Sequence, residues 1–181
     1  AGRVVANLVD EKDGRMAGAS VVEIDGSHGE GGGQVVRTAL ALSAVLGRAV
    51  EITSIRSARR NPGLQAQHLT GVRALAEICG ATVSGAEPGS GDLCFEPGAL
   101  HGGSYRFHVG TAGAISLVLQ TVLVPLAFAS EEAAIRITGG THVPWSPCFH
   151  YLDLQWLPYL RRMGFDASLE LELAGFYPQG N

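Results

Sequence analysis

Apolar and polar positions along the chain follow two periods, one typical of strands and one typical of helices. Short runs rich in β-branched residues predict strands at 20–25, 49–54, 81–85, 91–96, 104–109, 133–138 and 166–173. Longer segments with helical spacing predict helices at 34–47, 65–79, 112–129 and 148–163. The helix at 112–129 is apolar nearly all round, so we expect it to be buried.

Strands and helices alternate in a similar order in the two halves of the chain. This alternation predicts the α/β class, with the elements packed in layers as an α+β sandwich. The first unit spans residues 19–98 and the second spans residues 99–181. Residues 1–18 are charged in part and show no period, so we expect a lead-in or disordered segment there.

A glycine-rich loop follows the first predicted strand and leads into the first predicted helix. Residues 26–37 read Gly-Ser-His-Gly-Glu-Gly-Gly-Gly-Gln-Val-Val-Arg. Glycine backbone approaches a ligand closely, and a helix N-terminus offers unpaired N–H groups to an anion. Glu30 would repel a bare phosphate, so a bridging divalent cation is expected beside it. Arg37, one turn into the helix, adds a fixed positive charge.

This loop matches neither of the two common phosphate-binding motifs. A Walker loop needs Gly-Lys-Ser/Thr, and the single lysine of the chain is Lys12. The glycines do not form Gly-x-Gly-x-x-Gly with an acid about twenty residues later. Taken alone, the loop is therefore equally compatible with a glycine-rich surface turn.

A second segment suited to anions lies at residues 55–68. It contains Arg56, Arg59 and Arg60, and no acid occurs between Glu51 and Glu77. Arginine forks match phosphate oxygens well. A solvated basic loop is the alternative, but two such segments in one small chain favour a phosphate-bearing substrate.

Composition restricts the kind of partner. The net charge is −4, which argues against broad coating of nucleic acid but allows a local arginine cluster to hold one terminal phosphate. Cys79, Cys94 and Cys148 show no metal-ligand spacing, which is typical of reduced thiols in a cytoplasmic protein. No apolar run reaches the length of a membrane span.

Together these motifs resemble the RNA 3'-terminal phosphate cyclase family, from about residue 20 to the C-terminus. The resemblance is carried by Glu30–Arg37, Ile55-Arg56 with Arg59, Pro62-Gly63-Leu64, Gln67-His68-Leu69, Gly110–Gly113, Gly139-Gly140-Thr141 and Gly175–Pro178. It implies repeated β-α-β-α-β-β units similar to those of enolpyruvyl-shikimate-phosphate synthase. The family has a third such unit and a small inserted domain, both beyond residue 181.

The resemblance also implies an activity, an ATP-dependent ligase or nucleotidyl-transfer reaction in RNA processing. Members of this family adenylylate a histidine with ATP and pass AMP to an RNA 3'-phosphate. The neighbouring 2'-hydroxyl then displaces AMP and leaves a 2',3'-cyclic phosphate. The adenylylated histidine lies near the family's C-terminus, and no histidine of these 181 residues matches it.

Site residues carry over by motif. The resemblance places Arg37, Arg56, Arg59 and Gln67 around the RNA-terminal phosphate. Glu30 would bind Mg²⁺ or Mn²⁺, and Gln120 and Pro147 would contact ATP. Gln120 also fits a buried core amide bonded to backbone. His150 stands where the family usually has Asp, which puts local contacts in doubt.

Three functions are compatible with these residues. The first is a cyclase or its N-terminal part, acting with a missing C-terminal segment or as a homo-oligomer. The second is a non-catalytic cyclase-like protein that binds RNA. The third is an enolpyruvyl transferase, which would bind phosphoenolpyruvate and would not respond to ATP.

Overall fold

The computed structural model describes residues 21–180, and the predicted lead-in at 1–18 lies outside them. The first half holds β1 (Val22–Asp25), α1 (Gly33–Leu46), β2 (Val50–Thr53), α2 (Ala66–Cys79), β3 (Thr82–Ser84) and β4 (Leu93–Glu96). The second half holds β5 (Gly103–His108), α3 (Ile115–Ala127), β6 (Ala133–Thr138), α4 (Phe149–Tyr151), a π-helical turn (Leu152–Trp156) and α5 (Leu157–Arg162).

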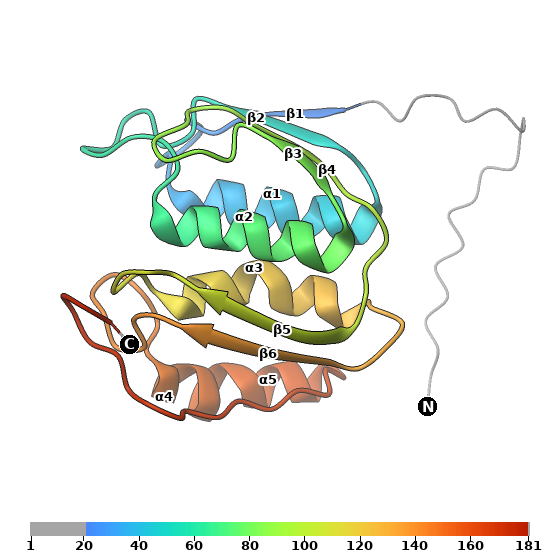
Figure 1. The fold of residues 1–181 in the computed structure, drawn as a ribbon, viewed down its shortest axis with the longest axis vertical. Coiled ribbons are helices and arrows are strands. Elements are labelled where there is room, and N and C mark those ends of the chain that lie inside the picture. Colours follow the sequence, from blue (N-terminus) through green and yellow to red (C-terminus); the bar gives the residue numbers. More distant parts are fainter. Residues whose placement is uncertain (1–20, 181) are drawn as a thin grey trace, which may run out of the picture.

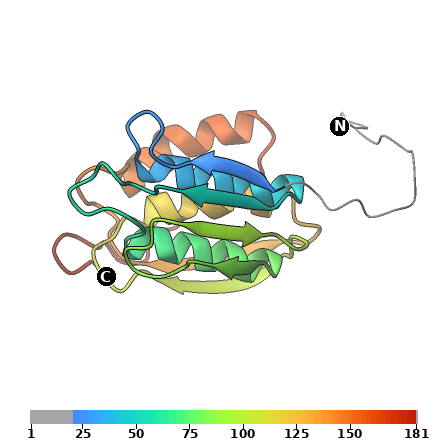
Figure 2. The same cartoon turned by 90° about the horizontal axis from the view of Figure 1, so that it is seen from above.

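The strands form two sheets separated by helices. Sheet 1 has the order β1-β2-β4-β3, in which β1 and β2 are parallel and β4 is antiparallel to both of its neighbours. Sheet 2 contains β5 and β6, which are parallel. Figure 1 shows α1 and α2 beneath sheet 1 and α3 between these helices and sheet 2. Figure 2, seen from above, shows the strands of sheet 1 laid over the helices. The predicted mixed α/β class is confirmed.

Most predicted elements form within three residues of their expected bounds. The predicted burial of the third helix is confirmed in part, because one face of α3, including Val118 and Val122, is buried, whereas Leu119 and Leu123 are half-buried. Gly71 of α2 lets α3 approach, since a Cβ at that position would lie 3.1 Å from Thr121 Oγ1. Within the described part of the chain, no helix combines the length and the apolar character that crossing a membrane requires.

The predicted helix at 148–163 is helical from Phe149 to Arg162 but contains a π-helical turn. Pro158 is the second residue of α5, which begins where this turn ends. Proline lacks the N–H that an α-helix needs and its ring crowds the carbonyl four residues earlier. Widening the preceding turn removes that crowding, which explains the π-helical segment.

The prediction of a strand at 166–173 is wrong. Half-buried and exposed side chains alternate from Asp166 to Glu172, but these residues form no strand and join no sheet in the described structure, and the chain bends at 172–173. Side-chain alternation reports which side of an extended segment faces the interior. A strand additionally needs a neighbouring backbone to accept and donate hydrogen bonds, and β6 has only β5 beside it among residues 21–180.

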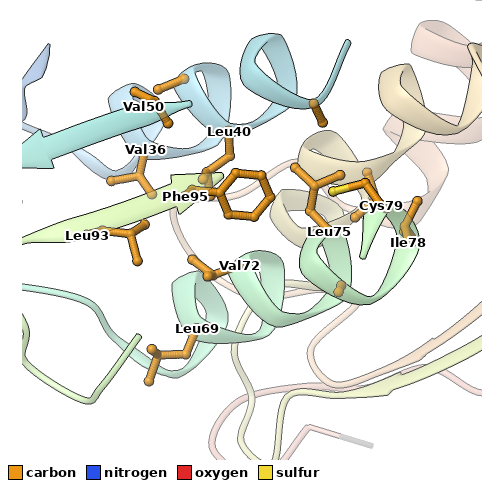
Figure 3. Close-up of a cluster of buried hydrophobic side chains, with 14 of the residues drawn as sticks. Val36, Leu40, Val50, Leu69, Val72, Leu75, Ile78, Cys79, Leu93 and Phe95 are labelled. Atoms are coloured by element: carbon orange, nitrogen blue, oxygen red, sulfur yellow. The ribbon is translucent and has the colours of Figure 1, made fainter. Parts of the chain in front are cut away.

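The hydrophobic core lies between sheet 1 and the helices below it (Figure 3). Leu40 of α1, Leu75 of α2 and Phe95 of β4 are at most 1% exposed. Apolar residues of α3 and sheet 2, including Val122 and Ile135, extend the same cluster. One core therefore spans both halves and fixes the helix ends relative to each other.

Replacing Leu40 by Ala tests this core. Leu40 is 1% exposed, so we expect Leu40→Ala to lower the free energy of unfolding by about 2–5 kcal/mol through lost contacts and a cavity. Leu42→Ala is the matched control on the same helix, because Leu42 is 53% exposed and should change stability by about 0.5 kcal/mol or less. Urea unfolding measures both, and equal losses would contradict the packing described here.

Candidate functional site

The glycine-rich loop turns back over the ends of β1 and β2. The carboxylate of Asp25 accepts hydrogen bonds from Ser27 N–H at 2.9 Å and from Ser27 Oγ at 2.7 Å, which fixes the first turn. These bonds lower the pKa of Asp25. Gly29 and Gly31 adopt left-handed φ values of 63° and 53°. The chain therefore reaches α1 by a route that side chains with a Cβ rarely follow.

The N-terminus of α1 is open and surrounded by nitrogen-bearing side chains. Its cap residue Gly32 provides no side-chain hydrogen bond, and no acid occurs in the first turn. A Cβ at Gly32 would lie 3.2 Å from Arg59 Nη2. A Cβ at Gly33 would lie 3.0 Å from Arg37 Nη1 and would collide with His68 Nε2. We call this group (Gly32, Gly33, Arg37, Arg59 and His68) the α1 anion site.

Arg37 is held in place by two amide side chains. Its Nε donates to Gln120 Oε1 at 3.0 Å, and its Nη2 donates to Gln34 Oε1 at 3.0 Å. Burial lowers the pKa of Arg37 from its ordinary value. Gln120 comes from α3, so the bond joins the two halves of the chain at this site. The partner of Gln120 is thus a side chain of the α1 anion site rather than backbone.

The other two predicted arginines lie in different environments. Arg56 has a positive φ of 53°, and its Nη1 donates to the carbonyls of Asn61 and Gly63 at 2.7 Å each. Burial and then the charge of Arg59 lower the pKa of Arg56. Arg59 is instead paired with Glu30 at 3.5 Å, and the Glu30 side chain is 95% exposed. Arg56 therefore fixes its own loop, and Arg59 joins that loop to the glycine loop.

His68, which the sequence places beside the arginine segment with either a substrate-side or a structural hydrogen bond, is a member of this site. Its Nδ1 accepts the N–H of Gln65 at 3.1 Å, so the neutral ring carries its proton on Nε2, the atom that faces Gly33. Burial, and then the charges of Arg56 and Arg37, lower its pKa from 6.5 to about 4. At neutral pH His68 is thus an uncharged donor. A capping box with His at its third helical position was the available signal.

Gln67 connects the site to the loops of the second half. Its Oε1 accepts the N–H of Ala114 at 3.1 Å, at the start of α3. The 110–114 loop in turn accepts a bond from the loop after β6, where Gly140 N–H donates to Gly113 O at 2.9 Å. Pro147 lies exposed in that second loop, and among the described contacts none joins it to the α1 anion site.

A histidine pair lies beside Pro147. His142 Nε2 is 3.0 Å from His150 Nδ1, and the His142 ring stacks on Phe176 with 5.3 Å between centroids. His150 stands where the family usually has Asp, so a carboxylate is missing there. In the structure its ring lies within hydrogen-bond distance of His142 instead.

Across residues 21–180 there is no group of three His, Cys, Asp or Glu side chains placed to bind a metal. Glu30 is the acidic side chain that the structure places beside the α1 anion site.

Comparisons with a family model and with curated proteins agree with each other on the family that this chain resembles. The sequence model of one family, described as RNA 3'-terminal phosphate cyclase, matches residues 28–181. The RNA 3'-terminal phosphate cyclase of Ralstonia nicotianae is 51% identical over 166 residues, which cover 92% of this chain and 48% of that protein. The protein of the same name from Archaeoglobus fulgidus is 49% identical over 160 residues, which cover 88% and 49% of the two chains. This chain spans about half the length of these curated relatives.

The protonation of His68 predicts how the free energy of unfolding depends on pH. The unfolded chain takes a proton on this ring as the pH falls through about 6.5, whereas the folded chain resists until about pH 4. Acid therefore favours unfolding across that window, by on the order of 3 kcal/mol for this group. We expect urea unfolding of the wild type to lose more stability between pH 7 and pH 4 than that of His68→Gln.

Glutamine is a usual residue at this position of a capping box, so the substitution preserves the helix start. His101→Gln, at an exposed site, is the control and should follow the wild type. Identical pH dependence in wild type and His68→Gln would contradict the neutral, buried state of this ring.

Proposed function

The chain belongs to the RNA 3'-terminal phosphate cyclase family, and we propose that it supplies the surface on which the 3'-phosphate end of an RNA is held. The observation that supports this most directly is the α1 anion site. There a bare helix N-terminus faces two guanidinium groups and a neutral imidazole N–H. A phosphate dianion finds donors of all three kinds within one turn of helix.

The charge distribution supports a single terminal phosphate rather than a nucleic-acid duplex. The net charge of the chain is −4, so attraction to RNA comes from a local group of arginines. The neutral state of His68 matters here, because a donor without charge can approach Arg37 without repulsion. Arg37 and Arg59 then provide the positive charge and His68 completes the set of hydrogen-bond donors.

Arg56 and Gln67 contribute in less direct ways. Arg56 uses one guanidinium nitrogen to hold the loop that carries Arg59, and its remaining N–H groups are available to the substrate. Gln67 uses its oxygen to hold the start of α3, which leaves its amide N–H groups as donors. We propose that both stabilise negative charge on the terminal phosphate as the 2'-oxygen attacks phosphorus.

The overall reaction we propose is ATP-dependent cyclisation. The adenylyl group of ATP is transferred to the RNA 3'-phosphate with release of pyrophosphate, the 2'-hydroxyl then displaces AMP, and a 2',3'-cyclic phosphate remains. Gln120 and Pro147 are proposed to contact ATP. Gln120 Oε1 is bound to Arg37, so its amide N–H groups are the part available to a nucleotide. Pro147 lies exposed beside Trp145, which is 99% exposed and offers a flat aromatic surface.

Glu30 fits the role of a metal ligand. Its carboxylate is exposed beside the α1 anion site, and Mg²⁺ is commonly held by one or two carboxylates together with substrate phosphates. Mg²⁺ or Mn²⁺ held there would offset the repulsion between Glu30 and phosphate. In this arrangement Glu30 binds the cation and Arg59, its present partner, turns to the phosphate.

The two halves are proposed to be copies of one β-α-β-α-β-β unit, the second lacking the pairing of its last strands.

A cytoplasmic location is proposed as well, because three free cysteines fit the reducing environment of the cytoplasm.

A non-catalytic RNA-binding role is the second candidate, because none of the six histidines stands in the family's nucleophile motif.

Removing two arginines tests the phosphate assignment. We expect Arg56→Ala combined with Arg59→Ala to lower the preference for a 3'-phosphate over a 3'-hydroxyl RNA end by roughly tenfold or more, because charge-assisted bonds are lost. Fluorescence anisotropy with the two RNA ends measures this. The control pair, Arg73→Ala with Arg106→Ala, removes equal charge from exposed positions and should keep the preference. Unchanged discrimination in the first pair would overturn the assignment.

Intact-mass analysis after incubation with ATP and Mg²⁺ or Mn²⁺ separates binding from catalysis. We expect no AMP adduct on this chain, while RNA with a 3'-phosphate still binds, since no histidine matches the family nucleophile. The full-length Ralstonia nicotianae relative serves as the positive control. An adduct on this chain would place a nucleophile within its 181 residues and contradict the residue roles given above.

A further inference from the structure

Two imidazole rings meet where the loop after β6 enters α4, outside the α1 anion site. His142 Nε2 lies 3.0 Å from His150 Nδ1, with 5.1 Å between the ring centroids. Phe149 N–H donates to Thr141 O at 3.2 Å, and this bond closes the loop and brings the two histidines together. His142 is half-buried and His150 is exposed, so the pair lies at the surface and is accessible to a ligand.

Aromatic neighbours hold both rings of the pair in place. The His142 ring stacks on Phe176 with 5.3 Å between centroids and 24° between planes. The backbone of Phe176 is also bridged to that of His142, so the stacked ring is fixed to the same loop. The ring of Phe149 meets His150 edge-on, with 5.7 Å between centroids. Side chains already fixed by packing lose little conformational freedom when they bind a ligand.

The second ring nitrogen of His142 has an oxygen partner. His142 Nδ1 lies 2.8 Å from Oγ1 of Thr141, a buried residue. The same Oγ1 accepts the N–H of Gly175 at 2.9 Å and lies 3.2 Å from Gly175 O. With its proton on Nδ1, His142 donates to the hydroxyl, the hydroxyl donates to Gly175 O, and Nε2 presents a lone pair. A histidine that binds a metal is usually supported in this way at its other nitrogen.

A metal ion needs only one change of tautomer to find both lone pairs. In the neutral pair a single N–H lies between His142 Nε2 and His150 Nδ1. A proton on His142 Nδ1 is accepted by Thr141, and a proton on Nε2 of the exposed His150 ring is accepted by water. Moving the shared proton to the outer nitrogen of the ring that carries it turns two lone pairs toward the same space, and no proton leaves the pair.

We propose that His142 and His150 bind one divalent transition-metal ion, of the class of Zn²⁺, Cu²⁺ and Ni²⁺. Two Zn–N bonds of about 2.0–2.1 Å at a tetrahedral angle place their nitrogens roughly 3.3 Å apart, close to the 3.0 Å between these rings. Imidazole suits these ions, whereas Mg²⁺ prefers oxygen ligands, so the site differs in its ion from the one proposed at Glu30.

Water or the oxygen atoms of a bound anion complete the coordination. Among residues 21–180 no third His, Cys, Asp or Glu side chain joins the pair as a ligand. Zinc commonly has four ligands, and a site with fewer protein ligands keeps positions open to water or substrate. This inference rests on neither the cyclase activity nor the α1 anion site.

Metal titration of the 181-residue chain, without RNA, ATP or an affinity tag, tests the proposal. Isothermal titration calorimetry should show a single Zn²⁺ site that excess Mg²⁺ does not occupy. His150→Gln should weaken Zn²⁺ binding by roughly tenfold or more, because losing a ligand costs at least as much as losing its outer partner. His101→Gln, at another exposed histidine, is the control and should bind like the wild type. Electron paramagnetic resonance with Cu²⁺ should show two imidazole nitrogens in the wild type and one in His150→Gln.

The hydroxyl of Thr141 gives a second test. Thr141→Val removes the support of His142 Nδ1 and should weaken Zn²⁺ binding by about 10–100-fold, whereas Thr141→Ser keeps the hydroxyl and should retain binding. Urea unfolding without metal checks that each variant is folded, and His150→Gln, at an exposed position, decides alone if Thr141→Val is not. Absence of saturable Zn²⁺ binding, equal binding by His150→Gln, or displacement of Zn²⁺ by Mg²⁺ would overturn the proposal. The phosphate assignment is measured without transition metals, so its failure is a separate result.

Discussion

The close approach of the His68 ring to the backbone at Gly33 is the contact on which the site depends. It brings the start of α2 against the start of α1, and only a residue without Cβ permits it. The same contact buries His68, which keeps the ring neutral and directs its N–H to the helix end. A larger residue at 33 would separate the helices and remove the enclosure that gives the arginines their position.

Two amide side chains extend this contact into the second half. Gln120 of α3 holds Arg37, and Gln67 of α2 holds the start of α3. The hydrophobic core crosses the same boundary, since Val122 and Leu126 of α3 pack with residues of α1 and α2. The side chains of the α1 anion site and Gln120 are therefore held by one packed set of helices, so a shift of α3 would move Gln120 relative to Arg37.

Sheets 1 and 2 differ in how their edges are satisfied. In sheet 1 a strand fills the place between β2 and β3, so each inner strand has two neighbours. In sheet 2 the corresponding place is a groove whose walls are already aligned. The groove lies on β6 and α3, whereas the side chains of the α1 anion site come from α1, α2 and the loop before α2.

Sequence by itself determined the elements, the mixed α/β class and the family, because periodicity and motif spacing are local properties. It also identified Glu30, Arg37 and Arg59, which lie on the glycine and arginine segments that the structure brings together. Only the tertiary structure decided that His68 is a neutral donor, that Gln120 binds Arg37, and that 166–173 is not a strand. The physical reason is that burial, tautomer and strand pairing depend on neighbours distant in the chain, which local pattern does not specify.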